Sequence, residues 1–148
     1  MQQSNEALIF FYGTFMNADV LEKHGLGSKN TAPAKLLDYE LTIRPRVNLR
    51  KRENKVVYGA TTSLAHDDVS SLYDGLQKNF GLVYRPYAVL AHYTNHSFAP
   101  ALCYVADSME DGEPDEGYIR QMAECAELAG APNEYIDHIR SFLGRARR

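Results

Sequence analysis

The strongest constraint on the fold of this chain is an apolar run near its amino terminus that stops abruptly at a glycine. Residues 7–12 read ALIFFY, and Gly13 follows them. Isoleucine, phenylalanine and tyrosine favour extended backbone, and the run is too short and too apolar for an amphipathic helix. We therefore predict a buried strand that ends at Gly13, where the main chain can turn tightly or approach a ligand closely.

The segment after this strand predicts either a binding loop or an ordinary strand-to-helix turn. Asn17 is a favourable N-cap for a short helix over residues 18–23, which Gly25 and Gly27 would end. In that arrangement the backbone N–H groups of the loop and the positive end of the helix would face one small concavity. Such a concavity suits an anion or a carbonyl oxygen.

The length and composition predict one compact domain, with its core over residues 8–143 and a frayed basic tail over residues 145–148. The chain has 148 residues, of which 45% are hydrophobic, and a net charge of −3. A general nucleic-acid binder is usually more basic, so we expect no nucleic-acid partner. No apolar stretch approaches the roughly 20 residues that span a bilayer, and residues 1–6 lack the pattern of a signal peptide. We therefore expect a cytoplasmic protein without a membrane partner.

The pattern along the chain places strands first and helices last. We predict extended segments at residues 34–44, 55–64, 84–92 and 98–105, with a polar hairpin tip at residues 50–54. Helical periods occur at residues 67–75, from residue 114 to Gly130, and after Pro132. This order favours an α+β domain on an antiparallel or mixed sheet, whose five or six short strands can curl into a small β-barrel with flanking helices. The two cysteines and the His92 and His96 pair lack a metal-ligand spacing, so no metal site is expected.

Five short motifs occur in an order that carries further information. They are YGT at residues 12–14, VYG at 57–59, YDGLQ at 73–77, a strand from Tyr84 to Val89, and GAPNEY at 130–135. Together they resemble the γ-glutamylcyclotransferase-like proteins, and they span nearly the whole chain. The resemblance implies a small barrel with flanking helices, a cavity at its mouth, and no metal or organic cofactor.

The resemblance also implies a chemistry and a set of site residues. Enzymes of that family release 5-oxoproline from γ-glutamyl compounds when the substrate's α-amine attacks its own γ-carbonyl. The reaction needs a carboxylate of raised pKa as general acid and base, N–H donors for the oxyanion, and a folded substrate. The implied substrate-binding residues are a loop and three tyrosines, namely Tyr12, Gly13, Thr14, Phe15, Tyr84, Tyr104 and Tyr118.

Other interpretations of these side chains stay open. Each of the three tyrosines could equally be a core aromatic residue with its hydroxyl at the surface. Arg44, Arg46 and Asn48 lie before the predicted hairpin tip. One of these two arginines could pair with a substrate carboxylate.

The sequence departs from the family pattern at the catalytic position. The family's general base lies three residues after the aspartate that corresponds to Asp74 and seven before Tyr84, and both counts lead to Gln77. A glutamine amide cannot exchange a proton near neutral pH, and loss of a general base typically costs about 10²- to 10⁴-fold in rate. Three hypotheses follow: an enzyme inactivated by a Glu→Gln exchange, a natural binder without turnover, or an enzyme that uses another carboxylate such as Asp74, Glu40 or one in the acidic loop at 107–116.

The sequence therefore predicts a γ-glutamylcyclotransferase-type protein with a small-molecule γ-glutamyl substrate. The products would be 5-oxoproline and a free amine or amino acid. The alternative is a non-catalytic binder of a γ-glutamyl-like molecule in the same cavity. A third, more remote hypothesis is an interaction module in which the barrel is a scaffold and the basic tail binds a partner, since a fold does not fix a function.

Overall fold

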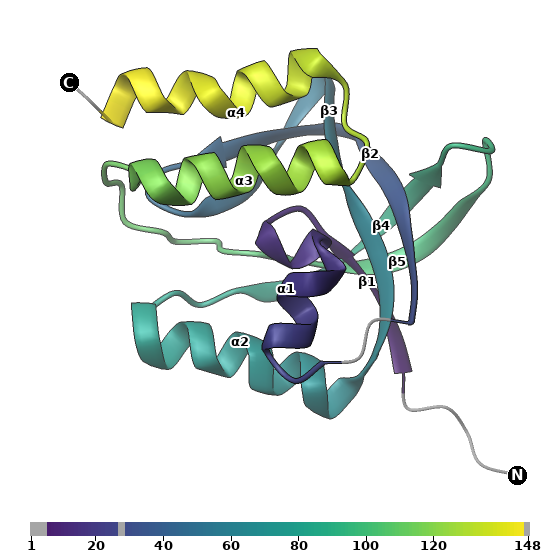
Figure 1. Ribbon diagram of the computed structural model, residues 1–148. Coiled ribbons are helices and arrows are strands. Elements are labelled where there is room, and N and C mark those ends of the chain that lie inside the picture. Colours follow the sequence, from purple (N-terminus) through teal and green to yellow (C-terminus); the bar gives the residue numbers. More distant parts are fainter. Residues whose placement is uncertain (1–5, 27–28, 147–148) are drawn as a thin grey trace, which may run out of the picture.

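The computed structural model describes residues 6–26 and 29–146 and shows a five-stranded sheet flanked by helices (Figure 1). The elements in chain order are β1 (Glu6–Phe11), the 3₁₀ turn η1 (Thr14–Met16), α1 (Ala18–Lys23), β2 (Lys29–Ile43), β3 (Val47–Ala65), α2 (His66–Phe80), β4 (Arg85–Tyr93), β5 (Phe98–Val105), α3 (Glu116–Leu128) and α4 (Asn133–Ala146). The predicted α+β class is confirmed.

The sheet closes into a barrel with the strand order β1-β3-β2-β4-β5. All pairings are antiparallel except the short parallel contact between β1 and β5, where Ile9 lies opposite Leu102. Within the described residues of β2, only Ala34 and Lys35 pair with β4. The β4–β5 hairpin therefore joins the rest of the barrel through short pairings, with β2 on one side and with β1 on the other. The predicted small mixed barrel is confirmed.

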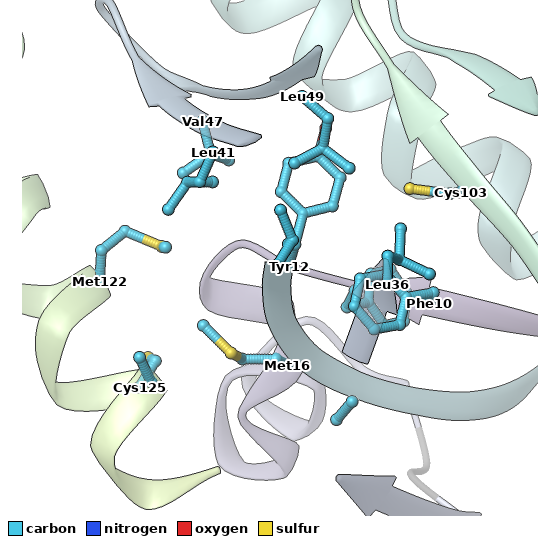
Figure 2. Packing of buried hydrophobic residues seen from close by; sticks show 14 of the residues in the cluster. Phe10, Tyr12, Met16, Leu36, Leu41, Val47, Leu49, Cys103, Met122 and Cys125 are labelled. Carbon is cyan, nitrogen blue, oxygen red and sulfur yellow. The ribbon is translucent and has the colours of Figure 1, made fainter. Parts of the chain in front are cut away.

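The core lies inside the barrel and continues between the barrel and the two carboxyl-terminal helices. Ile9 and Phe10 of β1 have no exposed surface, as the apolar run predicts. Figure 2 shows Met122 and Cys125 of α3 directed toward the turn that carries Met16. In Figure 1, α3 and α4 lie side by side on one side of the molecule, α2 lies on the other, and α1 lies between α3 and α2. Helices therefore pack against the barrel near the end of β1, where the predicted loop lies.

Gly59 allows the backbones of β1 and β3 to approach each other closely. A Cβ atom at this position would lie 2.1 Å from the carbonyl oxygen of Phe11, far inside van der Waals contact. Phe11 is the last residue of β1, so the approach at Gly59 fixes where the following loop begins. The VYG motif therefore has a structural reason, which is the close packing of the two strands behind the loop.

The predicted hairpin tip at residues 50–54 is wrong. These residues belong to β3, where Arg50 pairs with Glu40, and the turn between β2 and β3 lies at residues 44–46. The register shifts near Asp38, and Asn54 donates its backbone N–H to the Asp38 carboxylate at 3.0 Å. Residues 50–55 are exposed throughout, so no alternation of apolar side chains marks this part of the strand.

Three of the helix ends agree with the sequence and one does not. The Asn17 side chain accepts a hydrogen bond from the Asp19 N–H at 2.9 Å, which confirms the predicted N-cap of α1. Gly25 and Gly130 have positive φ angles after α1 and α3, as expected, whereas Gly27 lies outside the described residues. By contrast, α2 continues past the predicted end at residue 75 and stops at Gly81, whose φ is +68°.

The far end of the basic tail, residues 147–148, also lies outside the described part of the chain. In the residues that the structure describes, every helix is too short or too polar to cross a lipid bilayer.

Candidate functional site

A small cavity of about 90 Å³ opens at the end of the barrel where β1 and β5 stop and β4 starts. The structure brings all seven predicted substrate-binding residues to its wall. They are Tyr12, Gly13, Thr14, Phe15, Tyr84, Tyr104 and Tyr118. The other lining residues are Phe11, Arg46, Val47, Tyr73, Leu76 and Leu82. The sequence thus predicts where the cavity lies, while the binding role of each residue stays a prediction.

The loop after β1 contributes backbone donors to this wall. It forms the 3₁₀ turn η1, in which the N–H groups of Met16 and Asn17 donate to the carbonyls of Gly13 and Thr14, both at 3.1 Å. The first N–H groups of such a turn have no acceptor within it. A side chain at Gly13 would place its Cβ 3.0 Å from Val47, so glycine lets the loop pack against the start of β3.

Three tyrosine hydroxyls hold the backbone around the cavity. Tyr12 donates to the carbonyl of Tyr104 at 2.6 Å, and Tyr84 donates to the carbonyl of Val47 at 2.8 Å. The Tyr118 hydroxyl accepts the Val47 N–H at 3.3 Å. Because Tyr118 acts as an acceptor there, its own proton can be donated to a ligand in the cavity. Of the three tyrosines with two open interpretations, Tyr84 and Tyr118 therefore have their hydroxyls bound to the Val47 backbone, whereas Tyr104 contributes its carbonyl to the Tyr12 contact.

The tyrosine rings form a packed aromatic wall. Tyr73 of α2 stacks on Tyr104 with the ring centroids 4.0 Å apart and the planes 9° from parallel. Burial raises the pKa of Tyr12, Tyr73, Tyr84, Tyr104 and Tyr118 above the usual value of 10.0. All five phenols are therefore neutral hydrogen-bonding groups at physiological pH, and none of them can act as a base there.

Arg44 and Arg46, the two candidate partners of a substrate carboxylate, lie in different surroundings. Arg46 lines the cavity, and its guanidinium carbon lies 4.4 Å from the ring centroid of Phe80 and 4.5 Å from that of Tyr118. Arg44 points elsewhere and donates to the Asp111 carboxylate at 2.6 Å. Asn48 binds both the N–H and the carbonyl of Ala106, which ties β3 to the residue that follows β5.

Gln77 lies outside this cavity. It is exposed on the surface of α2 near the end of that helix, and the residues of α2 that line the cavity are Tyr73 and Leu76. Gln77 contributes its backbone carbonyl to the helix end, where it accepts the Gly81 N–H at 2.9 Å. The catalytic position assigned to Gln77 stays a prediction, and its exposure argues against that assignment.

Sequence reasoning missed five residues of the cavity wall, of which Tyr73 and Leu76 belong to α2 and the others are Phe11, Val47 and Leu82. The period that places Val69, Leu72 and Tyr73 on one face of α2 reaches Leu76 one turn later, at i+7 from Val69. This signal was present in the sequence, but the glycine at position 75 suggested an earlier end of the helix. Gly75 is accommodated inside α2, with no atom within 4 Å of the Cβ that it lacks.

None of the alternative carboxylates lines the cavity in the described structure. Asp74 is exposed on α2. In the acidic loop, Asp107 accepts a hydrogen bond from Tyr87 at 2.5 Å and Asp111 binds Arg44. The described lining residues therefore contain no carboxylate and no imidazole that could exchange a proton with a ligand.

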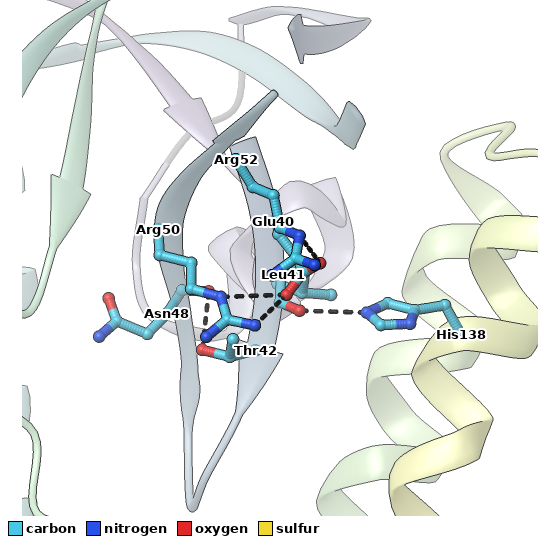
Figure 3. Close-up of polar contacts among 7 residues, drawn as sticks. All are labelled: Glu40, Leu41, Thr42, Asn48, Arg50, Arg52 and His138. Atoms are coloured by element: carbon cyan, nitrogen blue, oxygen red, sulfur yellow. Dashed lines mark hydrogen bonds and ion pairs between the residues drawn. The ribbon is translucent and has the colours of Figure 1, made fainter. Parts of the chain in front are cut away.

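Glu40 belongs to a separate polar cluster on the outer part of the β2–β3 hairpin (Figure 3). Its carboxylate binds Arg50, with one contact at 3.0 Å, and lies 3.5 Å from Arg52. His138 of α4 contacts the neighbouring Leu41 carbonyl at 3.1 Å. The hydrogen bond from Arg50 is the main cause that lowers the pKa of Glu40, so this carboxylate is ionised and paired rather than poised as a base.

The barrel, the loop after β1 and the tyrosine-lined cavity define a γ-glutamylcyclotransferase-like protein. The chain belongs to the AIG2-like family, whose model matches residues 56–139. No curated protein matches the sequence. The predicted resemblance is thus confirmed at the level of the family and the fold.

Solved structures agree with this assignment. A structure named gamma-glutamyl cyclotransferase superposes with a TM-score of 0.73 at 17% identity, over 91% of this chain and 86% of that one. An uncharacterized protein from Homo sapiens gives a TM-score of 0.73 at 16% identity, over 93% of this chain and 88% of that one. A yeast gamma-glutamyl cyclotransferase specific to glutathione gives 0.66 at 9% identity, over 97% of both chains. At these identities the likeness shows the fold alone.

Proposed function

We propose that this protein binds a γ-glutamyl compound, or a closely related amino-acid derivative, in the tyrosine-lined cavity and does not cyclise it efficiently. The observation that carries the proposal is that α2 lines the cavity with Tyr73 and with the apolar side chain of Leu76, which adjoins Gln77 in the sequence. Cyclotransfer needs a group that takes a proton from the α-amine and returns one to the leaving amine. The described wall of this cavity holds only neutral phenols, the hydroxyl of Thr14, apolar groups, backbone and one arginine.

Binding of such a ligand is supported by the donors around the cavity. The backbone N–H groups at the start of η1 suit a carbonyl oxygen, and the Tyr118 hydroxyl has a proton to donate. Family membership supports the same ligand class, because the fold neighbours include proteins named gamma-glutamyl cyclotransferases. The small volume suits a glutamyl head group better than a large, drug-sized ligand.

The test compares three proteins: the natural chain, Leu76→Glu and Gln77→Glu. Calorimetry measures the binding of a panel of γ-glutamyl amines and dipeptides, and 5-oxoproline release measures turnover. We expect the natural chain to bind without measurable release. Leu76→Glu should gain release of at least about 100-fold over the natural chain, because a carboxylate with apolar neighbours has a raised pKa suited to proton transfer. Gln77→Glu should gain nothing, because that position faces solvent.

A conventional cyclotransferase is the second candidate, and family membership favours it. It would be supported by 5-oxoproline release from the natural chain that survives extensive purification and disappears on Tyr118→Phe. Gain of activity in Gln77→Glu but not in Leu76→Glu would return the catalytic position to residue 77. Absence of any γ-glutamyl binding to the natural chain would overturn the proposed function.

A further inference from the structure

Arg46 is the charged side chain in the wall of the cavity. It follows β2 in the turn at residues 44–46, and its guanidinium lies over the rings of Phe80 and Tyr118. These contacts come from the end of α2 and the first turn of α3, so two helices hold the side chain from outside the barrel. An arginine held by aromatic rings loses little further conformational freedom when it binds a ligand.

The guanidinium has no counter-charge in the described structure. The ion pairs join Arg44 to Asp111, Arg50 and Arg52 to Glu40, and Arg120 to Glu116, and no described carboxylate lies within ion-pair distance of Arg46. Arg46 is also the only charged residue among the described residues that line the cavity. A cation beside apolar and phenolic walls interacts more strongly with an anion than a cation in water does.

We propose that Arg46 determines the ligand class of this cavity by binding a carboxylate of the ligand. This inference rests on the proposed function, and it adds that a γ-glutamyl ligand lies with its α-carboxylate toward Arg46 and its ammonium away from it. A guanidinium carries five N–H donors, so the contacts with the two rings leave donors for a carboxylate. A ligand whose α-carboxylate is converted to a carboxamide loses this charge-assisted contact.

The experiment measures the dissociation constants of γ-glutamylethylamide and of its α-carboxamide counterpart. For the natural chain we expect the carboxylate compound to bind at least about tenfold more tightly than the carboxamide. The preference should fall to about twofold or less in Arg46→Gln. In Arg46→Lys most of it should also be lost, because an ammonium cannot offer paired donors.

Arg44→Gln is the matched control. It removes the same charge two residues away, from a side chain that pairs with Asp111 and does not line the cavity. The carboxylate preference of Arg44→Gln should equal that of the natural chain. An equal loss in both variants would mean that only the net charge matters, and an unchanged preference in Arg46→Gln would overturn the inference.

The two proposals fail in distinguishable ways. If neither γ-glutamyl compound binds the natural chain, the proposed function fails, and titration with acetate and glutarate then tests Arg46 alone. The guanidinium NMR resonances of Arg46 should shift and saturate with both acids, and those of Arg44 should stay in place. Arg46 resonances that do not move would overturn the inference in that case as well.

Discussion

At Gly59 a hydrogen atom is all that fits between two strands. We predict that Gly59→Ala lowers the free energy of unfolding by about 1–3 kcal/mol or more, because the new Cβ would lie 2.1 Å from the Phe11 carbonyl oxygen. Gly75→Ala is the control, since its Cβ would meet open space within α2, and it should raise the same free energy by about 0.5–1 kcal/mol. Urea unfolding of both variants provides the measurement, and equal effects would contradict the close approach at Gly59.

A second prediction concerns the hydroxyl of Tyr12. Tyr12→Phe removes the donor to the Tyr104 carbonyl and should lower the free energy of unfolding by about 1–3 kcal/mol, because the carbonyl loses its partner inside the protein. Tyr73→Phe serves as the comparison, since the Tyr73 hydroxyl makes no hydrogen bond to another described residue and its ring still stacks on Tyr104. Thermal unfolding should show a clear loss for Tyr12→Phe only. A larger loss for Tyr73→Phe would mean that the two hydroxyls have been assigned the wrong roles.

At the scale of elements, the β2–β3 hairpin gives a pH dependence. Because the pKa of Glu40 is lowered from its usual 4.5 by the Arg50 hydrogen bond, the ionised carboxylate stabilises the fold above that pH. The contribution disappears as the pH falls through the lowered pKa. Glu40→Gln should therefore be less stable than the natural chain near neutral pH, and the two should converge in acid.

The matched control for this prediction is Glu53→Gln, which removes the same charge from an exposed position in β3. Its stability should differ little from that of the natural chain at either pH. Denaturant unfolding at about pH 7 and about pH 3 checks both variants. A difference for Glu40→Gln that persists in acid would contradict an electrostatic origin.

The elements also show what the sequence could and could not predict. The apolar run of β1, the Asn17 cap and the glycine after α3 are local signals, and each was correct. The predicted hairpin tip is misplaced because residues 50–55 of β3 are exposed, so this part of the strand lacks apolar alternation and is held by backbone pairing and by the Glu40 cluster. The end of α2 was misplaced because a single glycine inside a helix costs only about 1 kcal/mol and does not stop it.

The sequence likewise predicts one part of the candidate site and misses another. The seven residues that the motif resemblance implies all line one cavity. The ends of strands in a barrel lie close together whatever their side chains are, so a correct fold is enough to predict this. The catalytic position is counted along the sequence instead, and in a helix neighbouring positions differ by a rotation of about 100°. Only the three-dimensional arrangement shows that Leu76 faces the cavity and that Gln77 faces solvent.

At the scale of the whole molecule, the buried tyrosines make stability sensitive to alkali. The pKa values of Tyr12, Tyr73, Tyr84 and Tyr118 are raised by burial above 10.0, so the native state keeps these protons at a pH where the unfolded chain releases them. Their contribution is therefore full below about pH 10 and is lost as the pH rises further.

We predict that the contribution of these tyrosines to the free energy of unfolding is nearly constant from about pH 7 to about pH 9. It should decrease steeply near pH 11. Denaturant unfolding at each pH gives the stability, and phenolate absorbance follows the tyrosines. The phenolate signal should rise together with loss of the fold. Ionisation of all tyrosines in a protein that stays folded would contradict their burial.

The neighbouring orientations of Leu76 and Gln77 make the cavity sensitive to the length of α2 as well as to its composition. Removal of one residue from the helix before Leu76 turns every later position by about 100° and advances it by about 1.5 Å, so that Gln77 takes the cavity-facing place without any substitution there. Insertions and deletions in this one helix are therefore a route by which a lineage with this barrel can acquire or lose a polar group at the site. Alignments of such proteins that treat α2 as gap-free will mistake a change in helix length for a change in chemistry.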